Sequence, residues 1–355
     1  MGTKEIVFIS NFFGDGGAAR VLSVLTGEFV KQGYKITLCS YSQSDKDEYK
    51  NADGVEHIKF NLRRKNKIAK RIERISVLRK ELKKHKAATV VAFEYFVNMQ
   101  TIVACFGLKN KIIISERNDP ASMGGKFPTS LLRNILYRFC DCLVCQTPDA
   151  KAYFPKAIQK KSVIIPNPIK EGLPSAFSGE REKKIINFCR LEKQKNLPLL
   201  IDAFELFLKK QDEYALHIYG DGREKTNLEE YIISKGMERR VFLHKATFDV
   251  HEKVLKAAMF VSSSDYEGLS NSMLEAMGIG LPVVCTDCPC GGARMVINDH
   301  ENGILVRTGD AKALSEAMLE IVNDDVLSWK LSENAVKIKE ELSVQKILCE
   351  WEKLI

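Results

Sequence analysis

The sequence predicts an α/β protein with two consecutive domains, each a parallel β-sheet flanked by helices. Short runs rich in Val and Ile alternate with amphipathic segments of helical length along the 355 residues, as in sheets with crossover helices. The alternation restarts after a polar stretch at 170–181, which we expect to be the linker between the domains, and the chain is too long for one typical core. We expect a first domain at 1–168 and a second at 181–339, with the C-terminal helix returning so that 340–355 pack on the first domain.

The first domain is expected to hold strands and helices in regular alternation. Its strands are residues 4–10, 35–40, 55–60, 89–93, 111–115, 142–145 and 162–165. A Gly-rich turn ending in Gly16 and Gly17 follows the first strand, and a helix at 18–31 comes next. The turn is not G-x-G-x-x-G, and no acidic residue directly ends the second strand, which disfavours a dinucleotide enzyme.

The second domain repeats the pattern, again expected to be Rossmann-like. Its strands are expected at 184–188, 215–219, 241–243, 260–264, 282–284 and 303–306. The chain is organised around the stretch Phe260–Val284, in which a strand leads through a turn into a helix that starts near Asn271 or Ser272 and ends at Gly278. Two such domains predict a ligand-binding cleft between facing sheet edges.

The net charge of +8 is concentrated in one segment. Residues 59–86 contain 13 Lys or Arg and two Glu, so the remaining chain is mildly acidic. From Lys67 the apolar spacing predicts an amphipathic helix, with Lys70, Arg71, Arg74 and Arg79 on its other face. A solvated helix packed on the sheet, an anionic membrane or lipid diphosphate, and nucleic acid are the three alternatives. We favour the membrane, because no nucleic-acid-reading module or aromatic pattern is visible.

Several other classes are disfavoured. No run of about 18 apolar residues is present, and the N-terminus lacks the layout of a signal peptide, so a cytoplasmic protein is expected. The ten cysteines do not show zinc-ribbon spacing. The D-x-D at Asp45 and Asp47 lies in a charged loop, so no catalytic metal is expected.

The candidate site combines carboxylates, cations and a helix N-terminus. Glu267 precedes the helix and Glu275 lies about one turn inside it. Two alternatives with a purely structural role stay open here. Ser272 and Glu275 fit a capping box, and Glu267 fits an ordinary solvated turn residue. Arg190 and Lys195 follow the first strand of the second domain, so both can reach one anion.

Together with the N–H groups of the helix start and the Gly16-Gly17 turn, these cations predict a cradle for a nucleotide diphosphate ester.

Four motifs in this order resemble the retaining glycosyltransferases of family 4, which have the GT-B fold. They are P-N-P at 166–168, R-x4-K-N at Arg190, Lys195 and Asn196, G-D-G at 220–222, and E-x7-E at Glu267 and Glu275. The resemblance covers essentially the whole chain. Within this family it resembles bacterial enzymes that add a hexose or N-acetylhexosamine to undecaprenyl-diphosphate-linked sugars. The layout of such an enzyme includes a basic helix like that at 67–86.

The resemblance implies a role for each motif residue. Arg190 and Lys195 would neutralise the leaving diphosphate, and Glu267 would hold sugar hydroxyls and steady positive charge at the anomeric carbon. Glu275 would bind the ribose. The donor site would be completed by the backbone of Leu269, Ser270 and Asn271 and by Gly16 and Gly17.

The resemblance also implies transfer on the front face, with the donor phosphate taking the acceptor's proton, and such a reaction would require no side-chain nucleophile.

The expected reaction moves GalNAc, Gal, Glc or GlcNAc from a UDP-sugar to a polyprenyl-diphosphate-linked saccharide, on the inner face of the cytoplasmic membrane. Alternatives are a nucleotide-sugar epimerase and a GDP-mannose-dependent transferase. Two positions depart from the family pattern: Arg117 stands where many relatives have His, and Met295 where an acid is common. Glu116 and Arg117 are therefore candidate sugar or acceptor contacts, and Lys70, Arg71 and Arg74 candidate membrane contacts.

Overall fold

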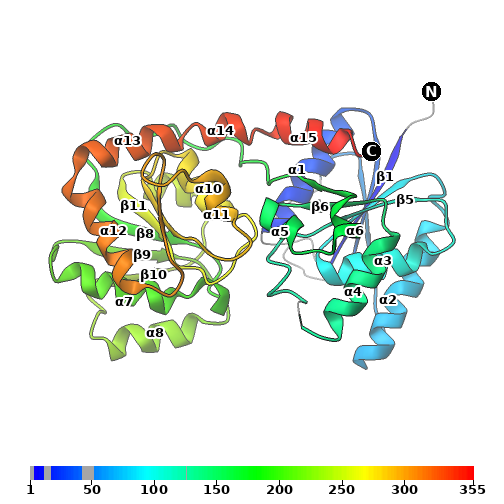
Figure 1. Ribbon diagram of the computed structural model, residues 1–355, viewed down its shortest axis with the longest axis horizontal. Coiled ribbons are helices and arrows are strands. Elements are labelled where there is room, and N and C mark those ends of the chain that lie inside the picture. Colours follow the sequence, from blue (N-terminus) through cyan, green and yellow to red (C-terminus); the bar gives the residue numbers. More distant parts are fainter. Residues whose placement is uncertain (1–3, 12–16, 42–51, 125) are drawn as a thin grey trace. The chain divides into compact units, whose positions relative to one another are not determined.

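The computed structural model describes residues 4–11, 17–41, 52–124 and 126–355. The chain divides into two compact units. Met1–Asn167 and Val344–Ile355 form the first, and Pro168–Ser343 forms the second (Figure 1). Each unit is an α/β fold around its own parallel sheet.

The first unit has a seven-stranded parallel sheet in its described part, in the order β3-β2-β1-β4-β5-β6-β7. The strands are β1 (Glu5–Ser10), β2 (Lys35–Ser40), β3 (Val55–Lys59), β4 (Thr89–Phe93), β5 (Lys111–Ser115), β6 (Cys142–Cys145) and β7 (Ser162–Ile164). The central strands are buried along nearly their whole length, because helices cover parallel sheets on both faces. All seven predicted strands are confirmed.

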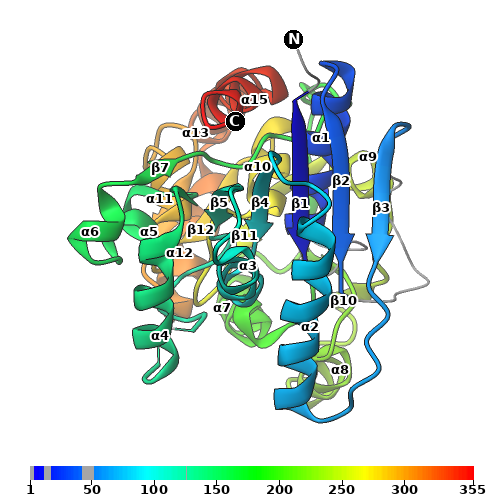
Figure 2. The same ribbon diagram turned by 90° about the vertical axis from the view of Figure 1, so that its right-hand side faces the viewer.

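The connecting helices are those of a doubly wound unit. They are α1 (Gly17–Lys31), α2 (Lys67–Leu82), α3 (Tyr95–Cys105), α4 (Thr129–Leu136), the 3₁₀ turn η1 (Tyr137–Phe139), α5 (Pro148–Ala152) and α6 (Lys156–Gln159). In Figure 2, α2, α3 and α4 lie in front of the sheet, and α3 packs against both of the others.

The last helix, α15 (Val344–Glu352), belongs to the first unit and contacts α1. Its Trp351 is fully buried and stacks on Phe93 of β4, with ring centroids 5.9 Å apart. The expected return of the C-terminal helix to the first domain is therefore confirmed.

The second unit has a six-stranded parallel sheet in the order β10-β9-β8-β11-β12-β13. The strands are β8 (Glu182–Phe188), β9 (Ala215–Tyr219), β10 (Val241–His244), β11 (Ala257–Ser262), β12 (Val283–Thr286) and β13 (Ile304–Val306). The helices are η2 (Lys193–Lys195), α7 (Leu197–Leu208), α8 (Lys225–Ser234), α9 (Val250–Val254), α10 (Asn271–Gly278), α11 (Gly292–Val296), α12 (Ala311–Asn323), α13 (Asp325–Ala335) and α14 (Ile338–Glu341). Helices α13 and α14 were not predicted.

The polar stretch at 170–181, expected to be a linker, is instead part of the second unit. Arg181 donates hydrogen bonds to the carbonyls of Ala257 and Gly280 and to Ser332 Oγ, at 3.0, 2.6 and 3.0 Å. Lys339 Nζ donates to the Pro174 carbonyl at 2.9 Å. These hydrogen bonds fasten the stretch to the second unit.

All ten cysteines are free thiols, and most are buried as small apolar side chains. Within the described ranges, no cluster of three or more His, Cys, Asp or Glu could hold a metal ion. A search of the same ranges finds no helix with the length and apolarity to cross a membrane.

Candidate active site

The candidate site lies where the order of the second sheet reverses. From β8 the chain winds outward to β9 and β10, then returns to β11 on the other side of β8. Ligands of open α/β sheets bind beyond the carboxyl ends of the two strands that flank such a point. Arg190 and Lys195 follow β8, and Glu267 follows β11.

Lys195 and Glu267 form an ion pair at this point. Their side chains are only 12% and 14% exposed. Glu267 also accepts hydrogen bonds from Gln194 Nε2 at 3.0 Å and from Ser264 Oγ at 2.9 Å. Glu267 is therefore a fixed, partly buried carboxylate with three donors, which answers the alternative of a solvated turn residue.

Further hydrogen bonds fasten the two loops together. Asn196 Nδ2 donates to Asp265 Oδ1 at 2.7 Å, and Ser263 Oγ donates to the Lys195 carbonyl at 2.9 Å. The Asp265 N–H donates to the Gln194 carbonyl at 2.9 Å. Asn196 has φ of 41° and caps α7 through its side chain, since Asn tolerates the left-handed conformation. This network holds Lys195 and Glu267 in place before any ligand arrives.

The charge of Lys195 is secured by its partner. Burial alone would lower the pKa of Lys195, but the Glu267 carboxylate outweighs it and the net pKa is raised. The positive charge of Arg190 acts in the opposite direction, so two cations lie close enough to influence each other. Arg190 itself is exposed and so accessible to an anion.

The G-D-G motif at 220–222 packs against the loop that follows β8. A Cβ on Gly220 would lie 2.0 Å from the Cys189 carbonyl oxygen, and one on Gly222 would lie 2.3 Å from that of Leu191. The Leu191 N–H donates to the Asp221 carbonyl at 2.8 Å. The two glycines therefore let the turn after β9 pack directly against the backbone of the segment that carries Arg190.

Helix α10 presents the second carboxylate. Its N-cap is Ser270, whose Oγ accepts from the Met273 N–H. The predicted capping box between Ser272 and Glu275 is therefore wrong. A box with Ser270 as N-cap would pair it with Met273, three residues later, and Glu275 lies two positions beyond that residue. Leu269 and Asn271 flank the cap, and the helix begins at Asn271, one of the two expected starts.

Glu275 instead pairs with a histidine. His251 Nε2 lies 3.0 Å from Glu275 Oε2, and Lys170 Nζ lies 3.4 Å from His251 Nδ1. The His251 ring is buried and packs edge-on against Phe188, with centroids 5.7 Å apart. Sequence reasoning missed His251, because one histidine in a short helix, 24 residues before Glu275, gives no local signal.

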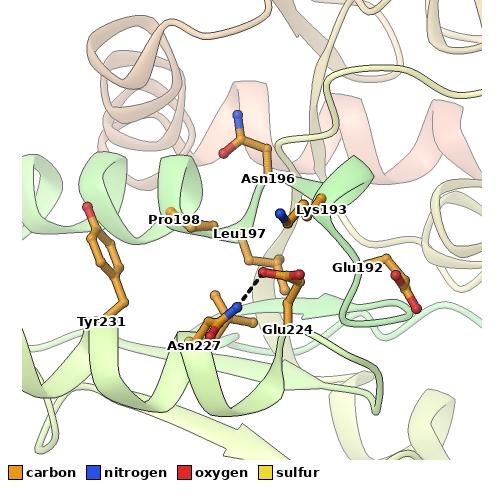
Figure 3. Close-up of a pocket in the computed structure, with 9 residues that line it drawn as sticks. Glu192, Lys193, Asn196, Leu197, Pro198, Glu224, Asn227 and Tyr231 are labelled. Atoms are coloured by element: carbon orange, nitrogen blue, oxygen red, sulfur yellow. Dashed lines mark hydrogen bonds between the residues drawn. The ribbon is translucent and has the colours of Figure 1, made fainter. Parts of the chain in front are cut away.

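A pocket of about 350 Å³ lies on the far side of the same loop, between the start of α7 and α8 (Figure 3). Its lining includes Glu192, Lys193, Asn196 and Glu224, and Glu224 accepts a hydrogen bond from Asn227. None of Arg190, Lys195, Glu267 and Glu275 lines it. Two carboxylates against one lysine make it unsuited to a diphosphate.

The first unit holds the remaining candidates. Gly16 lies outside the described residues, and Gly17 is the first residue of α1. Glu116 follows β5 but is only 2% exposed, and its Oε1 accepts from the Tyr137 hydroxyl. Burial raises the pKa of Glu116 to about 7, although the Tyr137 bond opposes the rise. Glu116 is therefore enclosed within its own unit, and its expected contact with the sugar or acceptor stays a prediction.

Arg117 is also held internally. Its guanidinium lies 4.5 Å from the Phe93 ring centre and 5.5 Å from that of Trp351, and Nη1 donates to Asn167 Oδ1 at 3.1 Å. Burial lowers its pKa to about 9, so it remains charged at neutral pH. Among the described residues, the Nε and Nη2 atoms of Arg117 have no hydrogen-bond partner.

The basic residues of α2 fall into two groups. Lys70 and Arg71 are exposed. Arg74 is partly buried over the Tyr41 ring at 4.8 Å, and Arg79 Nη1 donates to the Ala104 and Phe106 carbonyls at the end of α3, both at 2.7 Å. The expectation of one uniform basic face is therefore wrong for Arg74 and Arg79.

Two family models match consecutive parts of the chain. The model "Glycosyltransferase Family 4" matches residues 15–172, and "Glycosyl transferases group 1" matches residues 171–338. Together they span both units.

Relatives and solved structures agree with these matches. A Campylobacter jejuni protein named GalNAc-alpha-(1->4)-GalNAc-alpha-(1->3)-diNAcBac-PP-undecaprenol alpha-1,4-N-acetyl-D-galactosaminyltransferase is 28% identical, over 99% of this chain and 98% of that protein. The fold is similar to that of Staphylococcus aureus TarM (TM-score 0.82, 16% identity, 99% of both chains). It is also similar to Anabaena HepE in complex with UDP and glucose (TM-score 0.84, 16% identity, 98% of both chains). The chain is a glycosyltransferase that belongs to family 4 and has the GT-B fold.

Proposed function

We propose that this glycosyltransferase moves a hexose or N-acetylhexosamine from a UDP-sugar to a polyprenyl-diphosphate-linked saccharide, with retention of anomeric configuration. The observation that carries the proposal is the Lys195–Glu267 pair beside Arg190 at the switch point of the second sheet. The choice of acceptor is supported by the C. jejuni relative, whose name describes an undecaprenol-linked substrate.

In the proposed reaction the bond between the anomeric carbon and the phosphate oxygen breaks, and UDP leaves with the bonding electrons. Arg190 and Lys195 stabilise the negative charge that develops on the diphosphate, and such electrostatic stabilisation is usually the main source of rate enhancement. The acceptor hydroxyl attacks from the side on which UDP departs and gives its proton to the departing phosphate oxygen. No side-chain nucleophile takes part.

Glu267 is proposed to face the sugar while it neutralises Lys195. A fixed carboxylate can accept hydrogen bonds from sugar hydroxyls and stabilise an oxocarbenium-like anomeric carbon. Glu275 is proposed to bind the ribose hydroxyls, with the buried His251 fixing its orientation.

The cytoplasmic, peripheral membrane location is proposed from the exposed Lys70 and Arg71 of α2, which suit an anionic surface. We propose no metal requirement, because Arg190 and Lys195 supply the positive charge at the leaving group.

The test is a donor screen with UDP-GalNAc, UDP-Gal, UDP-Glc, UDP-GlcNAc and GDP-mannose and a polyprenyl-diphosphate-linked disaccharide. One UDP-sugar should be consumed to give an α-linked product, identified by the anomeric proton coupling in NMR. Lys195→Ala and Glu267→Ala should nearly abolish transfer. A β-linked product would refute retention. Conversion of the free UDP-sugar without acceptor would favour an epimerase instead.

A further inference from the structure

Helix α4 in the first unit buries a charged residue and exposes its apolar residues. Its one buried residue is Arg133, which is fully enclosed. Arg133 Nη1 donates to the Pro120 and Met123 carbonyls at 2.8 and 2.9 Å, and the guanidinium lies over the rings of Tyr153 and Phe154. The helix therefore buries its cation and leaves its apolar side outward.

The outward side forms a continuous apolar stripe. It consists of Phe127, Leu131, Leu132, Ile135 and Phe139, which are 46–80% exposed. Leu131 and Ile135 are four residues apart within α4, so they lie in one row on that helix. Phe127 precedes the helix, and Phe139 lies in η1, which follows it. Phe139 also packs against Phe106 at the end of α3, with ring centroids 5.3 Å apart, and Phe106 is itself exposed. Contiguous exposed apolar surface of this kind marks an interaction site.

Helix α2 adds a second apolar edge with positive charge around it. The predicted apolar row on α2 is buried only at its C-terminal end, at Leu78 and Leu82, whereas Ile68 and Ile72 are 69% and 64% exposed. Lys70 and Arg71, in the same turns, are exposed as well. Since α3 packs against both α2 and α4, both edges belong to one helical layer (Figure 2).

The two acidic residues of α2 offset only part of this positive charge. Glu73 accepts from the backbone N–H groups of Arg63 and Arg64, and Glu81 pairs with Lys84 and His85. Exposed cations also stand at both ends of the stripe, at Lys126 and Arg138. An apolar band between cations is the pattern of helices that lie in the headgroup region of a bilayer.

We propose that the α4 stripe inserts into the interfacial layer of an anionic bilayer, while Ile68 and Ile72 on α2 form a second point of insertion. This inference deepens the proposed function and rests on it for the lipid-linked acceptor. A second copy of the chain fits less well, because a symmetric contact through this layer would bring two strongly basic α2 helices together. In this arrangement the exposed cations attract the anionic surface and the apolar stripe provides the salt-resistant part of the binding.

The test compares binding of the full chain to vesicles of phosphatidylcholine alone or with phosphatidylglycerol. The variant Leu131→Gln/Ile135→Gln removes two insertion points, and we expect its partition onto anionic vesicles to fall about a hundredfold, or about tenfold per side chain. The matched control Ile233→Gln/Val326→Gln changes two residues of the second unit that are 62% and 78% exposed, and should bind like the parent. At 0.5 M NaCl, parent binding should weaken but persist.

Two further measurements make the result decisive. Because the substituted side chains are exposed, the thermal unfolding temperature and the transfer rate to a water-soluble acceptor should match those of the parent. The inference is overturned if the variant and parent bind vesicles equally, or if the parent does not bind at all. It is also overturned if sedimentation velocity shows a parent dimer that the variant loses. Loss of transfer with intact vesicle binding would instead count against the proposed function.

Discussion

We expect the Lys195–Glu267 pair to have two separable roles, in stability and in catalysis. Glu267→Ala removes the acceptor of three donors and leaves the ammonium of Lys195 with little exposure and no counter-charge. Lys195→Met/Glu267→Gln replaces the ion pair by neutral side chains of similar length. If the pair were only structural, the double variant should regain both stability and activity.

The magnitude follows from the burial of the pair. Breaking a buried ion pair by removing one partner costs about 3 to 5 kcal/mol, and the residual exposure of 12–14% places this pair at the lower end. For a unit of this size, a loss of about 3 kcal/mol lowers the unfolding temperature by about 6 to 12 °C. The double variant should recover about 2 kcal/mol of that loss, because the two substitutions are directly coupled.

Catalysis should behave differently from stability. Each single variant removes one electrostatic contribution to the transition state, which is worth about 10²- to 10³-fold in rate, and the double variant removes both. Differential scanning calorimetry and the rate of sugar transfer, measured on the same preparations, separate the two effects. A double variant that recovers transfer together with thermal stability would refute the catalytic reasoning.

Three further predictions concern other parts of the molecule. Burial raises the pKa of Glu116 from 4.5 to about 7, so between these values the folded unit keeps a proton that the unfolded chain loses, and stability falls as the pH rises. Glu116→Gln should therefore gain up to about 3 kcal/mol over the parent at pH 8 and nothing at pH 4, measured by urea unfolding; an equal gain at both values would contradict this. His251→Ala should weaken UDP binding about tenfold through loss of one hydrogen bond to Glu275, and His251→Gln should restore most of it in calorimetric titration, whereas equal losses would assign His251 a packing role only. A chelator should leave the transfer rate unchanged, and restoration by added Mg²⁺ or Mn²⁺ after chelation would show that a metal assists the two cations.

The central strands were predictable because they are short apolar runs with no competing helical periodicity. Val90–Phe93 and Ile112–Ser115 are buried throughout, as expected for parallel strands covered on both faces. The site residues Arg190, Lys195 and Glu267 were also predictable in position, since strand ends determine where such side chains meet.

The contacts between loops were not predictable from local patterns. Gln194 and Asn196 fasten the loop after β8 to the loop after β11, which is about 70 residues away in sequence. The stretch at 170–181 was mistaken for a linker for the same reason, because its contacts are distant in sequence. Its Arg181 hydrogen-bonds to Gly280 and Ser332 of the second unit. Composition indicates polarity but does not identify the partner.

The helices α2 and α4 show the limit of amphipathic patterns most clearly. A pattern predicts that a helix has an apolar side, but not that this side faces the protein. On α2 the apolar row is buried at Leu78 and Leu82 but exposed at Ile68 and Ile72. On α4 the side that faces inward carries Arg133, whose charge is compensated by carbonyls and aromatic rings. Since a globular unit gains nothing by exposing such apolar rows to water, their orientation is best explained by a surface outside the protein. Under the proposed function, this surface would also bring the chain to its lipid-linked acceptor, and it includes neither Lys195 nor Glu267.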